Sequence, residues 1–113
     1  MSSEKLTFEL LDSNAKEHVY RLKGPLVLSN MLAFQEALLA EPGDTILDLT
    51  EVPYVDSAGL GMLTNSFVSH QKRGHRLLLV AVNERVRTLF HVTKLDQLFS
   101  VFPSVEAARE GAA

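Results

Sequence analysis

The sequence predicts a single α/β domain over residues 1–113, with a mixed sheet of four or five strands covered by about four helices. Three observations support this fold class. Two segments with a strand pattern come first, separated by turn-forming residues, which is typical of a β-hairpin. After them, helical and strand patterns alternate, which indicates parallel strands joined by crossover helices. The apolar content of 46% and the charged content of 22% are those of an ordinary globular protein.

The first half of the chain is predicted to contain the hairpin, one helix and one buried strand. The hairpin should end at Gly24-Pro25, and Ser29 or Asn30 should cap the helix, whose apolar residues fall on one face. The predicted ranges are residues 5–11 and 18–23 for the hairpin strands, up to about Ala40 for the helix, and 45–49 for the buried strand.

The second half continues the alternation and completes the order β-β-α-β-α-β-α-β-α. Its longest helical pattern runs from Ser57 to about Arg73, and Gly74 fits the left-handed position beyond the helix end. Residues 77–82 form an uninterrupted apolar run, as expected of a strand covered on both faces. The remaining predictions are a short helix capped by Asn83, a strand at 98–102, a helix at 105–110 and a disordered tail at 111–113.

Charge and residue types exclude several classes of function. The net charge of −3 argues against nucleic-acid binding, which needs a basic surface. The chain has no cysteine, which excludes disulfides and thiolate metal sites. Residues 1–10 show no apolar stretch typical of a signal peptide, and the longest apolar run, 77–82, is too short to cross a bilayer. We therefore expect a cytoplasmic protein without a membrane span.

The sequence offers no catalytic constellation around Ser57. A nucleophile elbow has small residues two positions before and after the serine, whereas here Val55 stands before it and only Gly59 matches. The histidines show no spacing that indicates a base, and the carboxylates show no metal-binding spacing. Gly59-Leu60-Gly61 lacks the lysine of a Walker loop and the third glycine of a dinucleotide fingerprint. We therefore predict no enzymatic activity, no cofactor and no metal.

The stretch from Val55 to Leu63 is the most unusual in the sequence. Asp56 or Ser57 should cap the long helix, but capping does not explain Gly59 and Gly61, each of which costs up to about 1 kcal/mol relative to alanine. Glycine there indicates that another element or another protein approaches the backbone closely. One side of this helix is also small and uncharged, which suits either a partner or a neighbouring helix of the same domain. Its residues are Ala58, Met62, Asn65, Ser66 and Ser69.

The same stretch resembles the signature of STAS domains, and most of all that of the bacterial anti-sigma factor antagonists. The likeness covers nearly the whole chain, and its order of elements agrees with the prediction above, so it implies a STAS-like fold. It rests on Arg21 to Gly24, Ile46 to Thr50, Val52, Val55 to Gly61, Gly74, residues 77–82, Val86 to Phe90, Leu95 and Phe99.

The resemblance implies a phospho-regulated switch rather than an enzyme. In this family the serine at the position of Ser57 is phosphorylated by an anti-sigma factor that is also a serine kinase. The unphosphorylated antagonist binds that anti-sigma factor and frees the sigma factor, and a phosphatase resets the cycle. The residues then expected to contact the partner are Asp56, Ser57, Ala58, Gly59, Gly61 and Met62.

One segment departs from the family pattern. Relatives carry acids after the glycine of the second strand, whereas Gly24-Pro25-Leu26-Val27 carries none. An alternative is therefore a STAS accessory subunit or scaffold of another complex, for example a lipid-transport ATPase, that works without phosphorylation.

Overall fold

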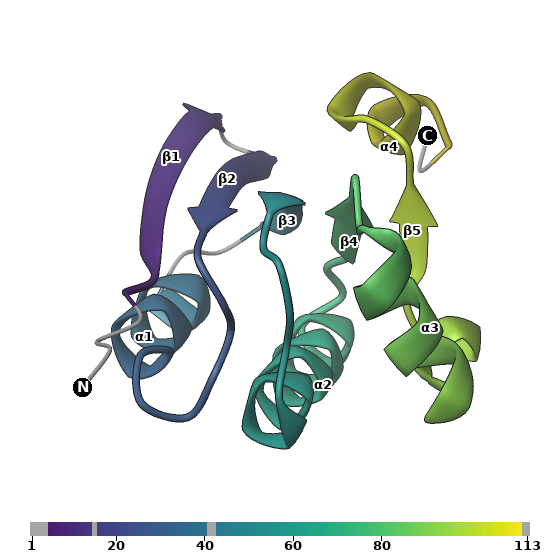
Figure 1. Cartoon of the computed structure of the whole chain (residues 1–113). Coiled ribbons are helices and arrows are strands. Elements are labelled where there is room, and N and C mark those ends of the chain that lie inside the picture. The colour runs from purple at the N-terminus through teal and green to yellow at the C-terminus, as the bar shows by residue number, and fades with distance from the viewer. Residues whose placement is uncertain (1–4, 15, 41–42, 112–113) are drawn as a thin grey trace.

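The computed structural model describes residues 5–14, 16–40 and 43–111, with the backbone alone at 39 and 40, and it has the predicted α/β fold (Figure 1). The order of helices and strands is the predicted one, with a short 3-10 helix, η1, before the last strand. The strands are β1 Thr7–Ser13, β2 Glu17–Lys23, β3 Asp44–Glu51, β4 Leu77–Val80 and β5 Ser100–Phe102. The helices are α1 Leu32–Ala40, α2 Ser57–Lys72, α3 Glu84–Val92, η1 Leu95–Gln97 and α4 Val105–Gly111.

The five strands form one sheet in the order β1-β2-β3-β4-β5. β1 and β2 pair antiparallel, as the predicted hairpin requires, and the other three pairs are parallel. Helices α1, α2 and α3 lie against one face of the sheet, and α4 lies against the other face near β4 and β5 (Figure 1). Because β3 is the central strand, the loop that follows it emerges at the middle of one end of the sheet.

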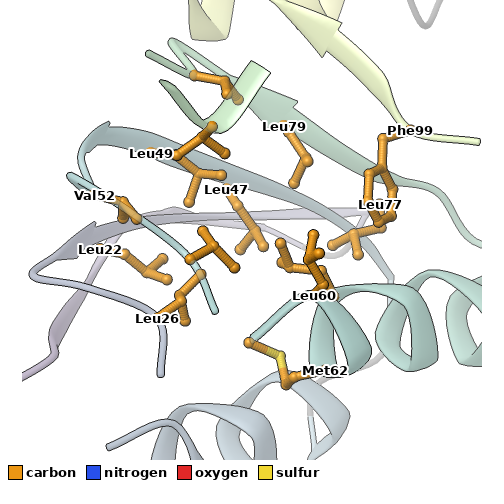
Figure 2. Close-up of a cluster of buried hydrophobic side chains, with 14 of the residues drawn as sticks. Leu22, Leu26, Leu47, Leu49, Val52, Leu60, Met62, Leu77, Leu79 and Phe99 are labelled. Atoms are coloured by element: carbon orange, nitrogen blue, oxygen red, sulfur yellow. The ribbon is translucent and has the colours of Figure 1, made fainter. Parts of the chain in front are cut away.

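Alternating side chains on the central strand supply both cores. Leu47 and Leu49 of β3 enter the large core under α1, α2 and α3, whereas Ile46 enters the smaller cluster under α4. In the large core the leucines of the sheet meet Leu60 of α2, while Met62 lies in the same core at the side of α2 toward α1 (Figure 2). Burying a side chain of this size contributes roughly 1.5–3 kcal/mol. These apolar contacts therefore decide where α2 lies on the sheet.

The last two strands are shorter than the sequence pattern predicts. The strand expected over residues 77–82 ends at Val80, because Ala81 has a left-handed backbone with φ 57°. The Ala81 N–H donates a hydrogen bond to the Phe102 carbonyl oxygen at 2.9 Å, so the turn stays tied to β5. The strand expected from residue 98 begins at Ser100, because η1 precedes it.

The caps predicted for α2 and α3 are confirmed, whereas the predictions for the start of α1 and for the C-terminus are not. Asn83 caps α3, and Gly74 has φ 79°, the left-handed conformation expected beyond α2. The predicted disordered tail is wrong for Gly111, which is the last residue of α4. A Cβ at Gly111 would overlap the Phe102 ring, so tertiary packing holds this residue. Residues 112–113 lie outside the described residues.

His70 is a buried polar residue near the end of α2. Its Nδ1 donates to the Ser66 carbonyl oxygen at 2.8 Å, and its Nε2 accepts from the Thr45 hydroxyl at 3.0 Å, which suits a neutral ring. Burial lowers the pKa of His70 below its ordinary value of 6.5, and the nearby Arg73 and His75 act in the same direction. The Ser66 carbonyl opposes this shift without reversing it.

Acidification from about pH 7.5 to about pH 5.5 should therefore destabilise the domain. Below about pH 6.5 the unfolded chain takes up a proton on His70 that the folded domain does not, so stability falls by up to about 1.4 kcal/mol per pH unit. Urea unfolding of wild type and His70→Gln at both pH values tests this. Wild type should lose more stability than the variant on acidification, and equal losses would contradict the prediction.

Candidate functional site at the start of helix α2

Ser57 is the first residue of α2 and follows the loop at the carboxyl end of the central strand. Asp56 is the N-cap of the helix: its backbone is extended, with φ −92° and ψ −178°, and its Oδ1 accepts a hydrogen bond from the Gly59 N–H at 2.8 Å. Ser57 itself is exposed. The exposed serine therefore lies at the positive end of the helix dipole.

A second loop, which precedes α1, is fastened to this helix start. Leu26 forms an isolated parallel bridge with Val55, and its carbonyl oxygen accepts a hydrogen bond from the Asp56 N–H at 3.1 Å. The Asp56 Oδ2 accepts a further hydrogen bond from the Leu28 N–H at 3.2 Å. One carboxylate thus binds both the first turn of α2 and the neighbouring loop.

Asn30 braces the second loop from within. Its Oδ1 accepts a hydrogen bond from the Val27 N–H at 3.2 Å, and its Nδ2 donates to the Pro25 carbonyl oxygen at 2.9 Å. The sequence pattern predicts Ser29 or Asn30 as the helix cap, but α1 begins at Leu32, beyond both. The Asn30 side chain instead fixes the loop that leads into α1.

Asn83 fixes the loop before Ser57 from the other side. Its Nδ2 donates to the carbonyl oxygens of Val52 and Pro53, both at 3.1 Å, while its Oδ1 caps α3. A hollow of about 360 Å³ lies between this loop and α3, and the Arg85 guanidinium carbon lies 5.2 Å from the centre of the Tyr54 ring there. The other residues that line the hollow are Val55, Val86, Thr88, Leu89 and Val92.

The two glycines of α2 lie in different environments. A Cβ at Gly59 would overlap the Leu26 carbonyl oxygen and lie 2.7 Å from Val55 Cγ1, so glycine lets the second loop approach the helix. A Cβ at Gly61 would meet nothing within 4 Å, and Gly61 is exposed. The close approach inferred from the sequence is therefore intramolecular at Gly59, whereas Gly61 leaves bare backbone on the surface.

Met62 is not on the surface. The resemblance implies that it contacts a partner, whereas the sequence pattern allows either a partner or a neighbouring helix. Its side chain is 1% exposed and packs in the large core, on the side of α2 toward α1 (Figure 2). Ser66, one turn further along, is also buried. The small residues of this side let α1 approach α2, so this part of the uncharged face is used for packing within the domain.

Four of the six predicted contact residues remain accessible. Ser57 and Gly61 are exposed, and Asp56 and Ala58 are partly buried. Only Asp56 among them is charged, and both of its oxygens already accept hydrogen bonds. The accessible surface is small and nearly neutral, which suits close contact with another protein surface better than the binding of an added charge.

The described part of the chain holds no group of three or more His, Cys, Asp or Glu residues that could bind a metal ion. His70 lies about 20 Å from Ser57 along α2, at about 1.5 Å per residue. Asp48 is buried on β3. Burial alone would raise the pKa of Asp48, but hydrogen bonds from Thr50 and Arg21 outweigh it and lower that pKa. The hydrogen bonds of His70 and Asp48 are thus made with other residues of the domain and not with Ser57.

The sequence analysis does not predict that the second loop contributes to the site. The sequence feature that marks this loop is an uncharged run, residues 25–32, directly after the break at Gly24. Leu28 and Leu32 of this run are 71% and 65% exposed, although apolar side chains of this size are usually buried. Periodicity assigns the run to a loop and a helix start but cannot indicate that it lies against Asp56.

These elements define an α/β domain with an exposed helix start at the carboxyl end of its central strand. The model of the STAS domain family matches residues 11–108, and the chain belongs to this family. The resemblance noted in the sequence is thus confirmed. No helix in the described ranges is both long enough and apolar enough to span a membrane.

Several relatives are anti-sigma factor antagonists. The anti-sigma-B factor antagonist of Listeria monocytogenes is 37% identical over 65 residues, which are 58% of this chain and 56% of that protein, so the match spans little more than half of the relative. A solved anti-sigma factor antagonist from Mycobacterium paratuberculosis shares the fold with a TM-score of 0.79 and 22% identity, over 94% of this chain and 92% of that one. The phosphorylated Bacillus cell fate determinant SpoIIAA has a TM-score of 0.73 and 17% identity, over 95% and 100%.

Gly59→Ala should lower the free energy of unfolding by about 1–3 kcal/mol. The added methyl group would overlap the Leu26 carbonyl oxygen, which cannot move freely because it accepts a hydrogen bond from Asp56. Thermal unfolding followed by circular dichroism measures the change.

Gly61→Ala is the matched control. It makes the same chemical change one half-turn further along α2, at a position with open space. Because alanine is the better helix former, this variant should gain up to about 1 kcal/mol. Two variants of equal stability would contradict the close packing at Gly59.

Proposed function

We propose that this protein is an anti-sigma factor antagonist whose binding to an anti-sigma factor is controlled by phosphorylation of Ser57. The observation that carries the proposal is the exposed Ser57 at the first position of a firmly capped helix, in a chain of the STAS family. The identity with the Listeria antagonist supports the role. The fold likeness to a protein solved in its phosphorylated form is consistent with the mode of control. The chain itself performs no chemistry: a kinase and a phosphatase act on it.

The domain should tolerate a phosphate on Ser57. The group adds about −1.5 to −2 charges at pH 7 and lies at a helix N-terminus, where anions are favoured. Because Ser57 is exposed, the phosphate stays hydrated. The Gly59 N–H already bonds with Asp56, so the existing cap need not rearrange.

The anti-sigma factor should not tolerate a phosphate on Ser57. A partner that fits closely over Ser57, Ala58 and Gly61 must remove water from the phosphate, and a surface complementary to neutral residues supplies no counter-ion. The neighbouring Asp56 carboxylate repels the phosphate, and this repulsion increases when the partner removes the water between them. Phosphorylation therefore releases the partner without unfolding the domain.

The segment that lacks the family's acids has a structural role here. Gly24 has φ 109°, and a Cβ there would overlap the Lys5 carbonyl oxygen. Leu26 is fully buried and bridges to Val55. These residues build the support for the helix start. Recognition by the kinase then rests on α2 and the adjoining loop rather than on acidic side chains at this position.

Ser57→Ala should bind the anti-sigma factor as tightly as wild type and stay bound when ATP is added, because it cannot accept a phosphate. Ser57→Asp should bind about tenfold more weakly or worse, which is about 1.4 kcal/mol. Its melting temperature should stay within about 3 °C of wild type, since an acid in the first turn suits the helix dipole. Affinity capture from native lysate identifies the partner, and calorimetry measures the affinities.

Ser104→Asp serves as the control for added charge. Ser104 Oγ accepts a hydrogen bond from the Ala107 N–H at 3.1 Å at the start of α4, on the other face of the sheet. This variant should bind as wild type. If Ser57→Asp also binds as wild type, and ATP leaves no phosphate on Ser57, phospho-regulation is wrong and the scaffold alternative describes the protein better.

A further inference from the structure

We propose that Leu28 and Leu32 form an apolar anchor for the anti-sigma factor beside Ser57, and that Asp56 positions it. This inference rests on the proposed function and specifies the chemistry of the partner. The opposing surface of the anti-sigma factor is apolar at this point rather than basic.

Exposure and composition identify the anchor. Leu28 is 71% exposed and Leu32 is 65% exposed, and no residue in the run 25–32 carries a charge. Exposed leucines scattered singly need no explanation. Both belong to one uncharged segment, the loop and the first residue of α1, and the Leu28 backbone lies beside the start of α2, where its N–H bonds with Asp56. Leu28 therefore adds apolar area next to the neutral surface at Ser57, and Leu32 adds more on the same segment.

The loop that carries Leu28 is held in place before any partner binds. Its own N–H donates to Asp56 Oδ2 at 3.2 Å, and Asn30 bonds with Val27 and with Pro25. A side chain on a fixed loop loses less conformational freedom on binding, so its apolar area contributes more to affinity. An exposed leucine on such a preorganised loop is therefore suited to bind an apolar surface.

The same carboxylate connects the anchor to the phosphosite. Asp56 Oδ2 bonds with Leu28, while Asp56 Oδ1 caps the helix that begins at Ser57. The loop and the helix start therefore keep a fixed relation, and a single partner surface can cover both. The residues of the run 25–32 beside this junction are uncharged, which favours an apolar contact.

The hollow between Tyr54 and α3 is the other surface at which the anti-sigma factor could make its apolar contact. Val92 at its border is 72% exposed, so it matches Leu28 in exposure and chemical type. Arg85, however, lies over the Tyr54 ring at this hollow and adds a charge to it. We therefore place the apolar contact on the loop, with Val92 as the comparison.

Calorimetry with the anti-sigma factor captured by wild type tests the anchor. Leu28→Ser and Leu32→Ser should each raise the Kd about tenfold, whereas Val92→Ser should stay within about twofold of wild type. If both leucine variants bind as wild type while Ser57→Asp is weak, the anchor is wrong and the proposed function stands. If Val92→Ser alone weakens binding, the partner uses the hollow and the anchor is equally wrong. If wild type captures no anti-sigma factor, the proposed function fails and the anchor fails with it.

Asp56→Asn tests the positioning role. Asparagine still caps a helix, but with its oxygen facing Gly59 its amide nitrogen cannot accept the Leu28 N–H. The melting temperature of Asp56→Asn should stay close to that of wild type. In a double-mutant cycle, Asp56→Asn should weaken binding several-fold in the wild-type background and leave Leu28→Ser unchanged. Additive losses would show that Asp56 does not act through Leu28.

Discussion

The two oxygens of the Asp56 carboxylate join helix α2 to the loop that precedes α1. Parallel strands end at the same end of a sheet, so the connections after β2 and β3 leave the sheet side by side. Backbone hydrogen bonds between Leu26 and Asp56 then tie these connections together. The glycine at position 59 gives this junction the room it needs, because any Cβ there would overlap the loop. The position of the loop relative to Ser57 depends on this arrangement.

The rest of α2 is committed to the interior of the domain. Leu60, Met62 and Leu63 pack in the large core, and the polar Ser66 and His70 on the inner side are buried with their hydrogen bonds made inside the domain. In the described residues no buried side-chain nitrogen or oxygen lacks a partner. The helix therefore has an accessible start on a well-packed body, and the proposed function requires such a surface, which changes its charge and keeps its shape.

Charge distinguishes what the domain tolerates from what a bound partner tolerates. An exposed helix start accommodates an anion in water, because its N–H groups favour negative charge and hydration is retained. The same anion under a closely fitted neutral surface loses that hydration without compensation. Under the proposed function, the uncharged surroundings of Ser57, which include Ala58, Gly61 and the run 25–32, make one added phosphate decisive for binding and minor for folding.

The sequence by itself determined the order of elements, the mixed sheet, the buried central strand and the position of Ser57 at a helix start. These follow from local periodicity and from cap and turn residues such as Asn83 and Gly74, whose preferences act within a few neighbouring residues. Tertiary structure alone decided which small residues of α2 face solvent. Helical periodicity places Met62 and Ala58 on the same side of the helix, but α1 covers Met62 and leaves Ala58 accessible. It also brought Leu28 to Asp56, across 28 positions of sequence. No local pattern encodes such contacts, because they form only when two strands and their loops come together in one sheet.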